Sequence, residues 1–124
     1  MNSILEKTYL AEAAIAANRI VKFGAADGAV LQAAAAADLM IGVASKDFAS
    51  VIGERTDIMR FGIAQVKLGG AVTRGQPVTS DATGQGVVAA PGAGVNVRII
   101  GFAETSGVLG DIIDVQIAPS VMQG

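Results

Sequence analysis

The side chains of this sequence best suited to acid–base catalysis or cation binding are four carboxylates: Glu54, Asp57, Asp111 and Asp114. Paired carboxylates can exchange protons with a substrate or ligate a hard cation such as Ca²⁺. Asp111 and Asp114 are three residues apart, and in a strand such side chains point to opposite faces of the sheet. An Asp at the start of a strand is also an ordinary turn residue. The spacing therefore favours structural roles for these carboxylates.

Other catalytic and phosphate-binding chemistry has little support in the sequence. The chain contains no His and no Cys, which excludes imidazole catalysis, thiol nucleophiles, disulfides and Cys/His zinc sites. Ser45-Lys46 lacks the motif that would make it a nucleophile–base pair. The glycine pairs at residues 84–86 and 92–94 do not continue into a phosphate loop and predict turns. We expect no catalytic residue, no cofactor and no metal, and thus a protein that is not an enzyme.

The elements that would position any site are predicted to be short strands within one domain. The chain has 124 residues, enough for one core. Val and Ile supply 26 of them and favour strands, while 16 Gly and only 3 Pro indicate many tight turns. We predict a mainly β fold, a small β-barrel or β-sandwich, with at most one or two short helical turns. The expected strands are residues 19–23, 29–32, 39–44, 57–68, 78–80, 87–90, 97–103 and 111–118.

Residues 1–18 are expected to form an N-terminal arm, followed by a single β domain at residues 19–124. Ala, Leu and Glu in this segment favour a helix, and Ser3 followed by Glu6 resembles a capping box. The favoured interpretation is an extended arm ordered by a partner, because the segment has few large side chains to anchor it to a core. The Ala run at residues 33–37 is too short for a stable helix and predicts a single turn or connector.

A strand–loop–strand unit occurs twice in the sequence. The motif IGVA at residues 41–44 recurs as IGFA at residues 100–103, and each copy is followed by a Gly-acid turn and a second apolar strand. A glycine within a strand often marks a close approach of two backbones, so we expect the units to cross at Gly42 and Gly101. The alternative is chance similarity between strings of Val, Ile, Ala and Gly. The matching turns and second strands are Gly53-Glu54 with Gly110-Asp111, and residues 57–64 with residues 111–118.

Composition also limits the partners. A net charge of −2 without a basic cluster argues against nucleic acid. No stretch reaches the ~20 apolar residues of a membrane span. Charged residues make up only 16% of the chain, which leaves apolar surface of the kind that usually marks a protein–protein interface. We therefore expect a homo-oligomer or a larger assembly, with neither nucleic acid nor a membrane as partner.

In the order of its elements, the sequence resembles the small capsid decoration (cement) proteins of tailed bacteriophages, specifically the DUF2190 group. The resemblance covers most of the chain from about Thr8 onward. The elements that carry it are the N-terminal arm, the strand at residues 19–23, and the motifs IGVA (41–44), GGAVTRG (69–75), VTSDATG (78–84), IGFA (100–103) and GDIIDV (110–115).

The resemblance implies a compact β-barrel or β-sandwich that forms homotrimers on the outer surface of a phage head. There it would bridge neighbouring major capsid subunits and strengthen the shell, after assembly in the cytoplasm of the bacterial host. The arm would lie along the capsid or a neighbouring subunit, and its large side chains are the expected contacts: Leu5, Tyr9, Leu10 and Ile15. The alternative is a small β-barrel ligand-binding or regulatory module that forms a homo-oligomer.

Overall fold

The computed structural model describes residues 2–44 and 49–124, and these residues form strands joined by turns, without a helix. The predicted mainly β fold is therefore confirmed. Ser45 and Lys46 lie outside the described residues. The strands are β1 (Asn2–Ala11), β2 (Arg19–Phe23), β3 (Ala29–Gln32), β4 (Met40–Ala44), β5 (Arg55–Lys67), β6 (Pro77–Ser80), β7 (Gly86–Val88), β8 (Asn96–Ala103) and β9 (Ile112–Gln123).

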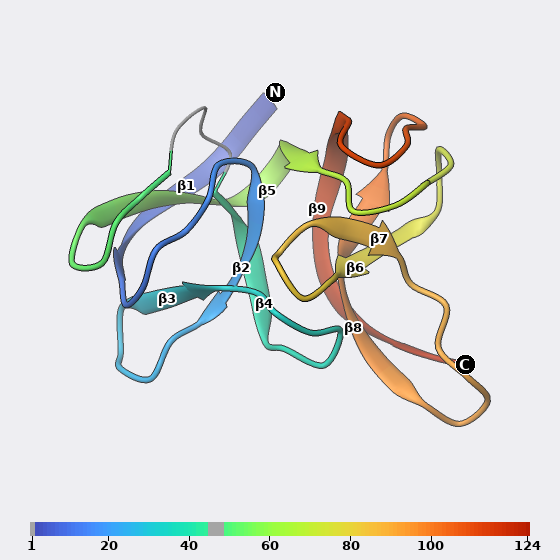
Figure 1. Ribbon diagram of the computed structural model, residues 1–124, viewed down its shortest axis with the longest axis horizontal. Helices are drawn as coiled ribbons and strands as arrows, with labels where there is room; N and C mark the ends of the chain where they lie inside the picture. The colour runs from blue at the N-terminus through green and yellow to red at the C-terminus, as the bar shows by residue number, and fades with distance from the viewer. Residues whose placement is uncertain (1, 45–48) are drawn as a thin grey trace.

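The first five strands close into a barrel, seen in the left half of Figure 1. Strand order runs β1-β3-β2-β4-β5, and β5 then pairs with β1. The β1–β5 ladder is antiparallel and extends from Asn2↔Ile63 to Leu10↔Arg55. On its other edge β1 pairs in parallel with β3, through Leu10↔Ala29 and its neighbour. The closure depends on β1, which joins the two ends of the strand series.

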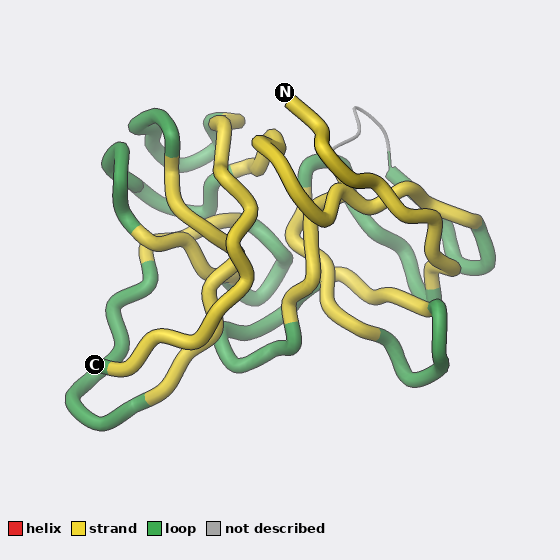
Figure 2. The backbone as a smooth tube through the Cα atoms, turned by 180° about the vertical axis from the view of Figure 1, so that it is seen from behind, coloured by secondary structure: helices red, strands yellow, loops and turns green. Residues whose placement is uncertain are grey.

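The remaining strands form a second lobe that repeats the strand order of the first, with the second half of β5 in the place of β1 and with β6 to β9 in the places of β2 to β5. Figure 2 shows the two lobes from behind. The second half of β5 pairs with β9, and the order continues β9-β8-β6-β7. A parallel bridge between Leu68 and Gly86 brings β7 back to the end of β5. The thirteen residues of β5 thus belong first to one lobe and then to the other.

The repeated strand–loop–strand unit is part of a larger structural repeat. Hydrogen bonds from Ala11 N–H to the Glu54 carbonyl and from Leu68 N–H to the Asp111 carbonyl occupy equivalent places in the two lobes. Antiparallel bridges also correspond: Ile15 with Ser50, and Val72 with Gly107. A third pair joins Asn18 N–H to the Ala44 carbonyl and Gly75 N–H to the Ala103 carbonyl; Asn18 and Gly75 both have positive φ, 57° and 89°. The similarity in sequence therefore reflects a five-strand unit that is built twice.

The strand glycines mark close backbone approaches, but these occur inside each unit. A Cβ on Gly42 would overlap the carbonyl oxygen of Met59 on β5, and a Cβ on Gly101 would overlap that of Gln116 on β9. The expected crossing between two units is replaced by tight packing of β4 on β5 and of β8 on β9. A residue with a side chain would force these strand pairs apart.

Two apolar clusters fill the molecule. One lies in the first barrel and includes Tyr9, Ile15 and Ile58. The other takes residues from both lobes, such as Ile20 of β2 and Ile100 of β8. Hydrogen bonds from Lys67 N–H to the Asn18 carbonyl, from Ile20 N–H to the Gly84 carbonyl and from Arg98 N–H to the Ala36 carbonyl also cross between the lobes. The second of these clusters is therefore a core that the two lobes share.

The N-terminal segment is extended, as favoured from the sequence, and its ladder partner is β5 of the same chain. The helical alternative is wrong for residues 2–11. Helix propensity is a weak preference worth a few tenths of a kcal/mol per residue, and pairing with β5 outweighs it. Tyr9, Ala11 and Ile15 are buried, so the second half of residues 1–18 contributes to the core.

The Ala run at residues 33–37 forms a turn, as predicted, and Asp38 holds it. Asp38 Oδ2 accepts hydrogen bonds from Ala34 N–H (2.7 Å) and Ala35 N–H (3.0 Å), and forms an ion pair with Lys22 Nζ at 3.2 Å. Burial alone would raise the pKa of Asp38. The backbone hydrogen bonds and the Lys22 ammonium outweigh burial and lower the pKa below its ordinary value of 3.8.

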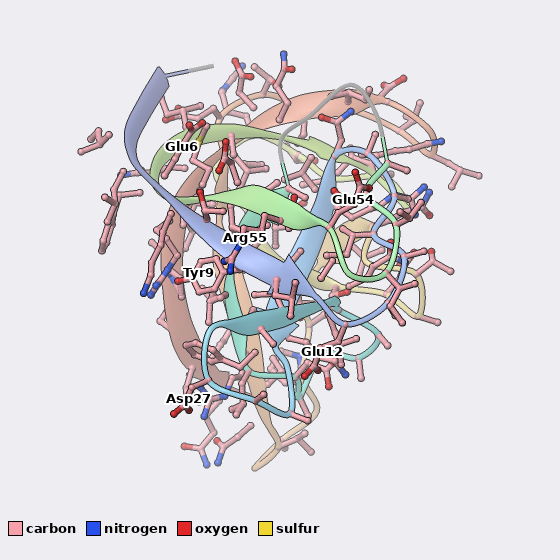
Figure 3. All side chains as sticks on the ribbon, turned by 90° about the vertical axis from the view of Figure 1, so that its left-hand side faces the viewer. Glu6, Tyr9, Glu12, Asp27, Glu54 and Arg55 are labelled. Carbon is pink, nitrogen blue, oxygen red and sulfur yellow. The ribbon has the colours of Figure 1, made fainter. Side chains whose placement is uncertain are left out.

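This lowered pKa makes the turn sensitive to acid. A carboxyl whose pKa is lower in the folded state contributes stability above its unfolded value, and that stability is lost as the pH falls through the lowered pKa. Asp38→Asn should therefore lower the melting temperature at pH 7, and the difference from wild type should shrink as the pH drops below 3.8. Asp27→Asn is the control, because Asp27 is exposed in the β2–β3 turn (Figure 3). If the difference in melting temperature between Asp38→Asn and wild type persists in acid, the lowered pKa of Asp38 is not the source of its stabilising effect.

The tight β8–β9 packing predicts a large effect of a single methyl group. Gly101→Ala should lower the free energy of unfolding by ~3 kcal/mol or more, because the methyl overlaps the Gln116 carbonyl. Gly92→Ala should be nearly neutral, since its Cβ would meet only Val95 Cγ2 at 3.8 Å. Urea denaturation of both variants measures the difference. Equal unfolding midpoints would show that β8 and β9 can separate without cost.

Truncation distinguishes the two halves of the N-terminal segment. Removal of residues 1–6 should leave a cooperatively folding chain, because the described side chains in this stretch are exposed. Removal of residues 1–18 should abolish cooperative unfolding, since it opens the first barrel and takes Tyr9, Ala11 and Ile15 out of the core. Circular dichroism during heating measures both. A cooperative transition in the chain that lacks residues 1–18 would show that the barrel closes without β1.

Candidate functional site

Of the four carboxylates singled out in the sequence, three accept structural hydrogen bonds. Glu54 Oε1 accepts from Val51 N–H at 2.6 Å, and Asp111 Oδ2 accepts from Val108 N–H at 2.9 Å. Asp57 Oδ1 accepts from the Thr8 hydroxyl at 2.6 Å and thereby links β5 to β1. The fourth, Asp114, is half-buried on β9. Within residues 2–44 and 49–124 no three His, Cys, Asp or Glu side chains gather in a way that could hold a metal ion.

The expected contact residues of the N-terminal segment divide into two kinds. Leu5 and Leu10 are exposed, whereas Tyr9 and Ile15 are buried in the first barrel. Alternation explains the contrast between the neighbours Tyr9 and Leu10, because successive side chains point to opposite faces of a strand. Leu5 lies in the stretch of β1 where residues 4–8 are all exposed, and Ile15 lies after β1, in a bridge with Ser50. In this fold only Leu5 and Leu10 are available to a partner. Tyr9 and Ile15 were expected at an interface but lie inside the chain's own core.

Tyr9 has a structural role at the closure of the barrel. Its hydroxyl accepts a hydrogen bond from Arg60 Nη1 at 2.6 Å, and Arg60 Nε donates to the Ile41 carbonyl at 3.1 Å. Arg60 thus connects β1, β4 and β5. Figure 3 shows the Tyr9 side chain at the side of the barrel that β1 crosses.

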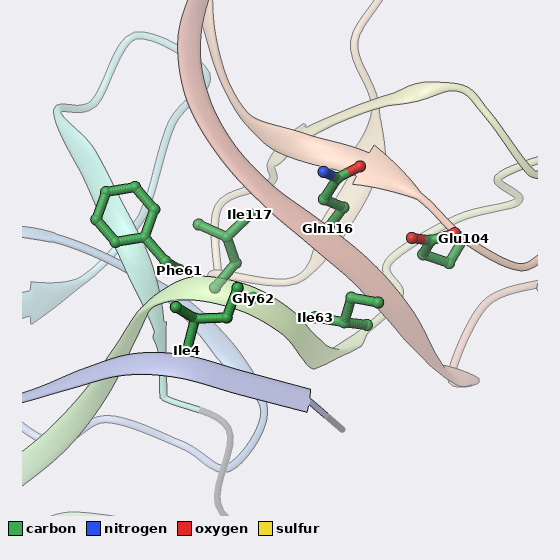
Figure 4. A pocket seen from close by; sticks show the side chains of 7 residues that line it. All are labelled: Ile4, Phe61, Gly62, Ile63, Glu104, Gln116 and Ile117. Atoms are coloured by element: carbon green, nitrogen blue, oxygen red, sulfur yellow. The ribbon is translucent and has the colours of Figure 1, made fainter.

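A hydrophobic recess opens where the two lobes meet (Figure 4). It has a volume of about 370 Å³. Its apolar lining comes from three strands, with Ile4 from β1, Phe61 and Ile63 from β5, and Ile117 from β9. Glu104 and Gln116 add a carboxylate and an amide to the lining. The recess therefore combines apolar surface with one negative charge.

The backbone of β5 shapes this recess. Gly62 has φ of 113°, a conformation that side-chain-bearing residues rarely adopt, and it lies where β5 passes from one lobe to the other. Phe61 and Ile4 beside it are exposed. Apolar surface of this kind on a folded chain usually marks a protein–protein contact. The recess is therefore the candidate interaction site.

Sequence reasoning did not identify Phe61, Ile63 or Ile117 as residues that line a recess. A signal was present, because residues 57–68 are apolar at both odd and even positions, as in Met59, Phe61 and Ile63 beside Ile58. Such a strand has apolar side chains on both faces, and one face can serve a partner. The convergence of β1, β5 and β9 depends on pairings between distant segments, which the local pattern does not contain.

Two properties of the described residues bear on the setting of the protein. No helix there has the length and apolarity that a membrane span needs. The exposed apolar side chains are spread over several elements and include Leu39 and Val95 as well as those of the recess. A surface with several such positions fits a protein that makes more than one contact.

One solved structure of similar fold is the head fibre gp8.5 N base of bacteriophage phi29. The two chains are 16% identical, with a TM-score of 0.65 over 97% of this chain and 98% of that chain. At this level of identity the similarity concerns the fold. A comparison with curated protein sequences gives no match.

The family comparison covers nearly the whole chain. A family model described as phage cement protein matches residues 2–117. The matched range contains both five-strand units up to the middle of β9, the recess and the N-terminal strand. By this match the chain belongs to the phage cement protein family.

Proposed function

We propose that this protein binds the outer surface of a phage head as a homotrimer and stabilises the shell by bridging neighbouring major capsid subunits. The observation that carries the proposal is the family match over residues 2–117, which makes the chain a structural, capsid-associated protein. The outer position, the trimer and the bridging go beyond that match. Assembly onto heads in the bacterial cytoplasm is part of the same proposal.

The surface of the chain supports a binding role. Three of the carboxylates that could have served catalysis accept hydrogen bonds within the fold instead. The recess offers apolar lining to a partner, with Glu104 to pair with a cation of that partner. A ligand-binding module, the alternative function, would need several convergent polar groups. The recess supplies one carboxylate and one amide, which fits an extended protein surface better.

The stabilising effect follows from mass action. A protein that binds only the assembled shell lowers the free energy of that state relative to dissociated subunits. Three linked chains would add avidity, because once one chain is bound the others act at high effective concentration. Each contact can therefore be small. A net charge of −2 is compatible with a site outside the shell, away from packaged DNA.

Heads that lack the protein provide the direct test. Purified protein should bind such heads and raise the temperature at which they release DNA, while light scattering of the free protein should give the mass of three chains. Phe61→Ser should weaken binding by about tenfold or more, since it removes the largest side chain of the recess. Phe23→Ser is the matched control, because Phe23 is 50% exposed against 51% for Phe61 and lies outside the recess. If wild-type protein neither binds heads nor protects them, the proposed function is wrong.

A further inference from the structure

The two five-strand units each carry an exposed aliphatic pair on an equivalent turn. In the β4–β5 connection the pair is Val51-Ile52, and in the β8–β9 connection it is Val108-Leu109. Ile52 and Leu109 are each 70% exposed. Figure 1 shows these connections in different lobes, one at the left edge and the other at the upper right. We call them the first tip (residues 51–54) and the second tip (residues 108–111).

The backbone of the two tips is the same. In the first tip, Glu54 N–H donates to the Val51 carbonyl at 3.2 Å and Gly53 has φ of 85°. In the second, Asp111 N–H donates to the Val108 carbonyl at 3.0 Å and Gly110 has φ of 89°. A hydrogen bond across four residues with positive φ at the third is the pattern of a type II turn.

Each tip is also fixed to its own barrel. Gly53 N–H donates to the Ala11 carbonyl, and Gly110 N–H donates to the Leu68 carbonyl, both at 2.9 Å. The carboxylate at the end of each turn accepts the N–H of the first aliphatic residue. The tips are therefore rigid, and a rigid loop loses little conformational entropy on binding.

The turn explains some of the tip residues but not the aliphatic pairs. Its backbone requires Gly53 and Gly110, and the acids bind the turn N–H groups. Nothing in this geometry calls for Ile52 or Leu109, whose side chains are mostly in water. Exposed aliphatic side chains on a rigid turn are characteristic of a contact with another protein.

We propose that the two tips bind equivalent apolar pockets on two neighbouring copies of one capsid subunit. Because the tips share one backbone geometry and carry nearly the same side chains, one pocket shape on the capsid subunit accepts either of them. The acid common to both tips favours a pocket bordered by Lys or Arg. A capsid lattice presents such a pocket repeatedly, so a single chain bridges two subunits. This inference rests on the proposed function and specifies its partner.

Variants of the tips test the inference on heads that lack the protein. Ile52→Ser and Leu109→Ser should each weaken binding to heads by ~10²-fold, because loss of one contact removes the avidity between the two. The double variant should bind heads more weakly than either single variant, at the level that the recess around Phe61 supports without the tips. Val121→Ser is the control, since Val121 is 58% exposed, as is Val51, and lies on β9 away from both tips. Melting temperatures should equal that of wild type, because the substituted side chains are exposed.

Dissociated capsid subunits provide the second arm. One subunit offers one pocket, so wild type and both single variants should bind it with affinities within about twofold of each other, and only the double variant should bind it markedly more weakly. If wild type binds heads and both tip variants bind as tightly as Val121→Ser, the tips are not contacts and the inference is overturned while the proposed function stands. If only one tip matters, the two-contact bridge is overturned. If wild type fails to bind heads, the proposed function itself is wrong.

Discussion

The whole structure depends on the pairing of β5 with strands from both lobes. Its first part forms the ladder with β1 that closes the first barrel, and its last five residues form the ladder with β9 that begins the second. Backbone N–H and C=O groups inside a protein must be paired, and this continuous strand pairs them for both lobes. Gly62, with its positive φ, lies where β5 passes from one lobe to the other, and the cluster containing Ile20 and Ile100 fills the space between the lobes. Breaking β5 would therefore open the first barrel and remove the strand with which β9 pairs in the second lobe.

Local sequence patterns predicted most of the strands and none of the closure. Strands at residues 19–23 and 29–32 have the predicted bounds, and the IGVA and IGFA motifs lie on corresponding strands. The sequence did not reveal that residues 2–11 close a barrel, because the partner of β1 on β5 is about fifty residues away and the Ala-rich stretch favours a helix. The burial of Tyr9 and Ile15 has the same origin. Of the expected surface, Leu5 and Leu10 are exposed, and the recess around Phe61 exists only when β1, β5 and β9 meet.

Several polar side chains of the described residues hold the fold together. Glu54, Asp57 and Asp111 accept hydrogen bonds that hold turns or join strands, and Arg60 joins three strands through Tyr9 and Ile41. What remains for other molecules is mostly aliphatic surface on rigid elements, which suits a protein that strengthens an assembly by contact.

Duplication lets the two halves of the chain be compared with each other. Asn18 and Gly75 stand at equivalent positions and both have positive φ. Two residue types therefore meet the same backbone requirement, since Asn is among the residues that adopt this conformation most readily. Where both halves keep a feature that the backbone does not demand, as with the aliphatic pairs of the turns, the reason lies outside the chain. Comparison of the two halves of this chain thus distinguishes residues that the fold requires from residues that a binding partner requires.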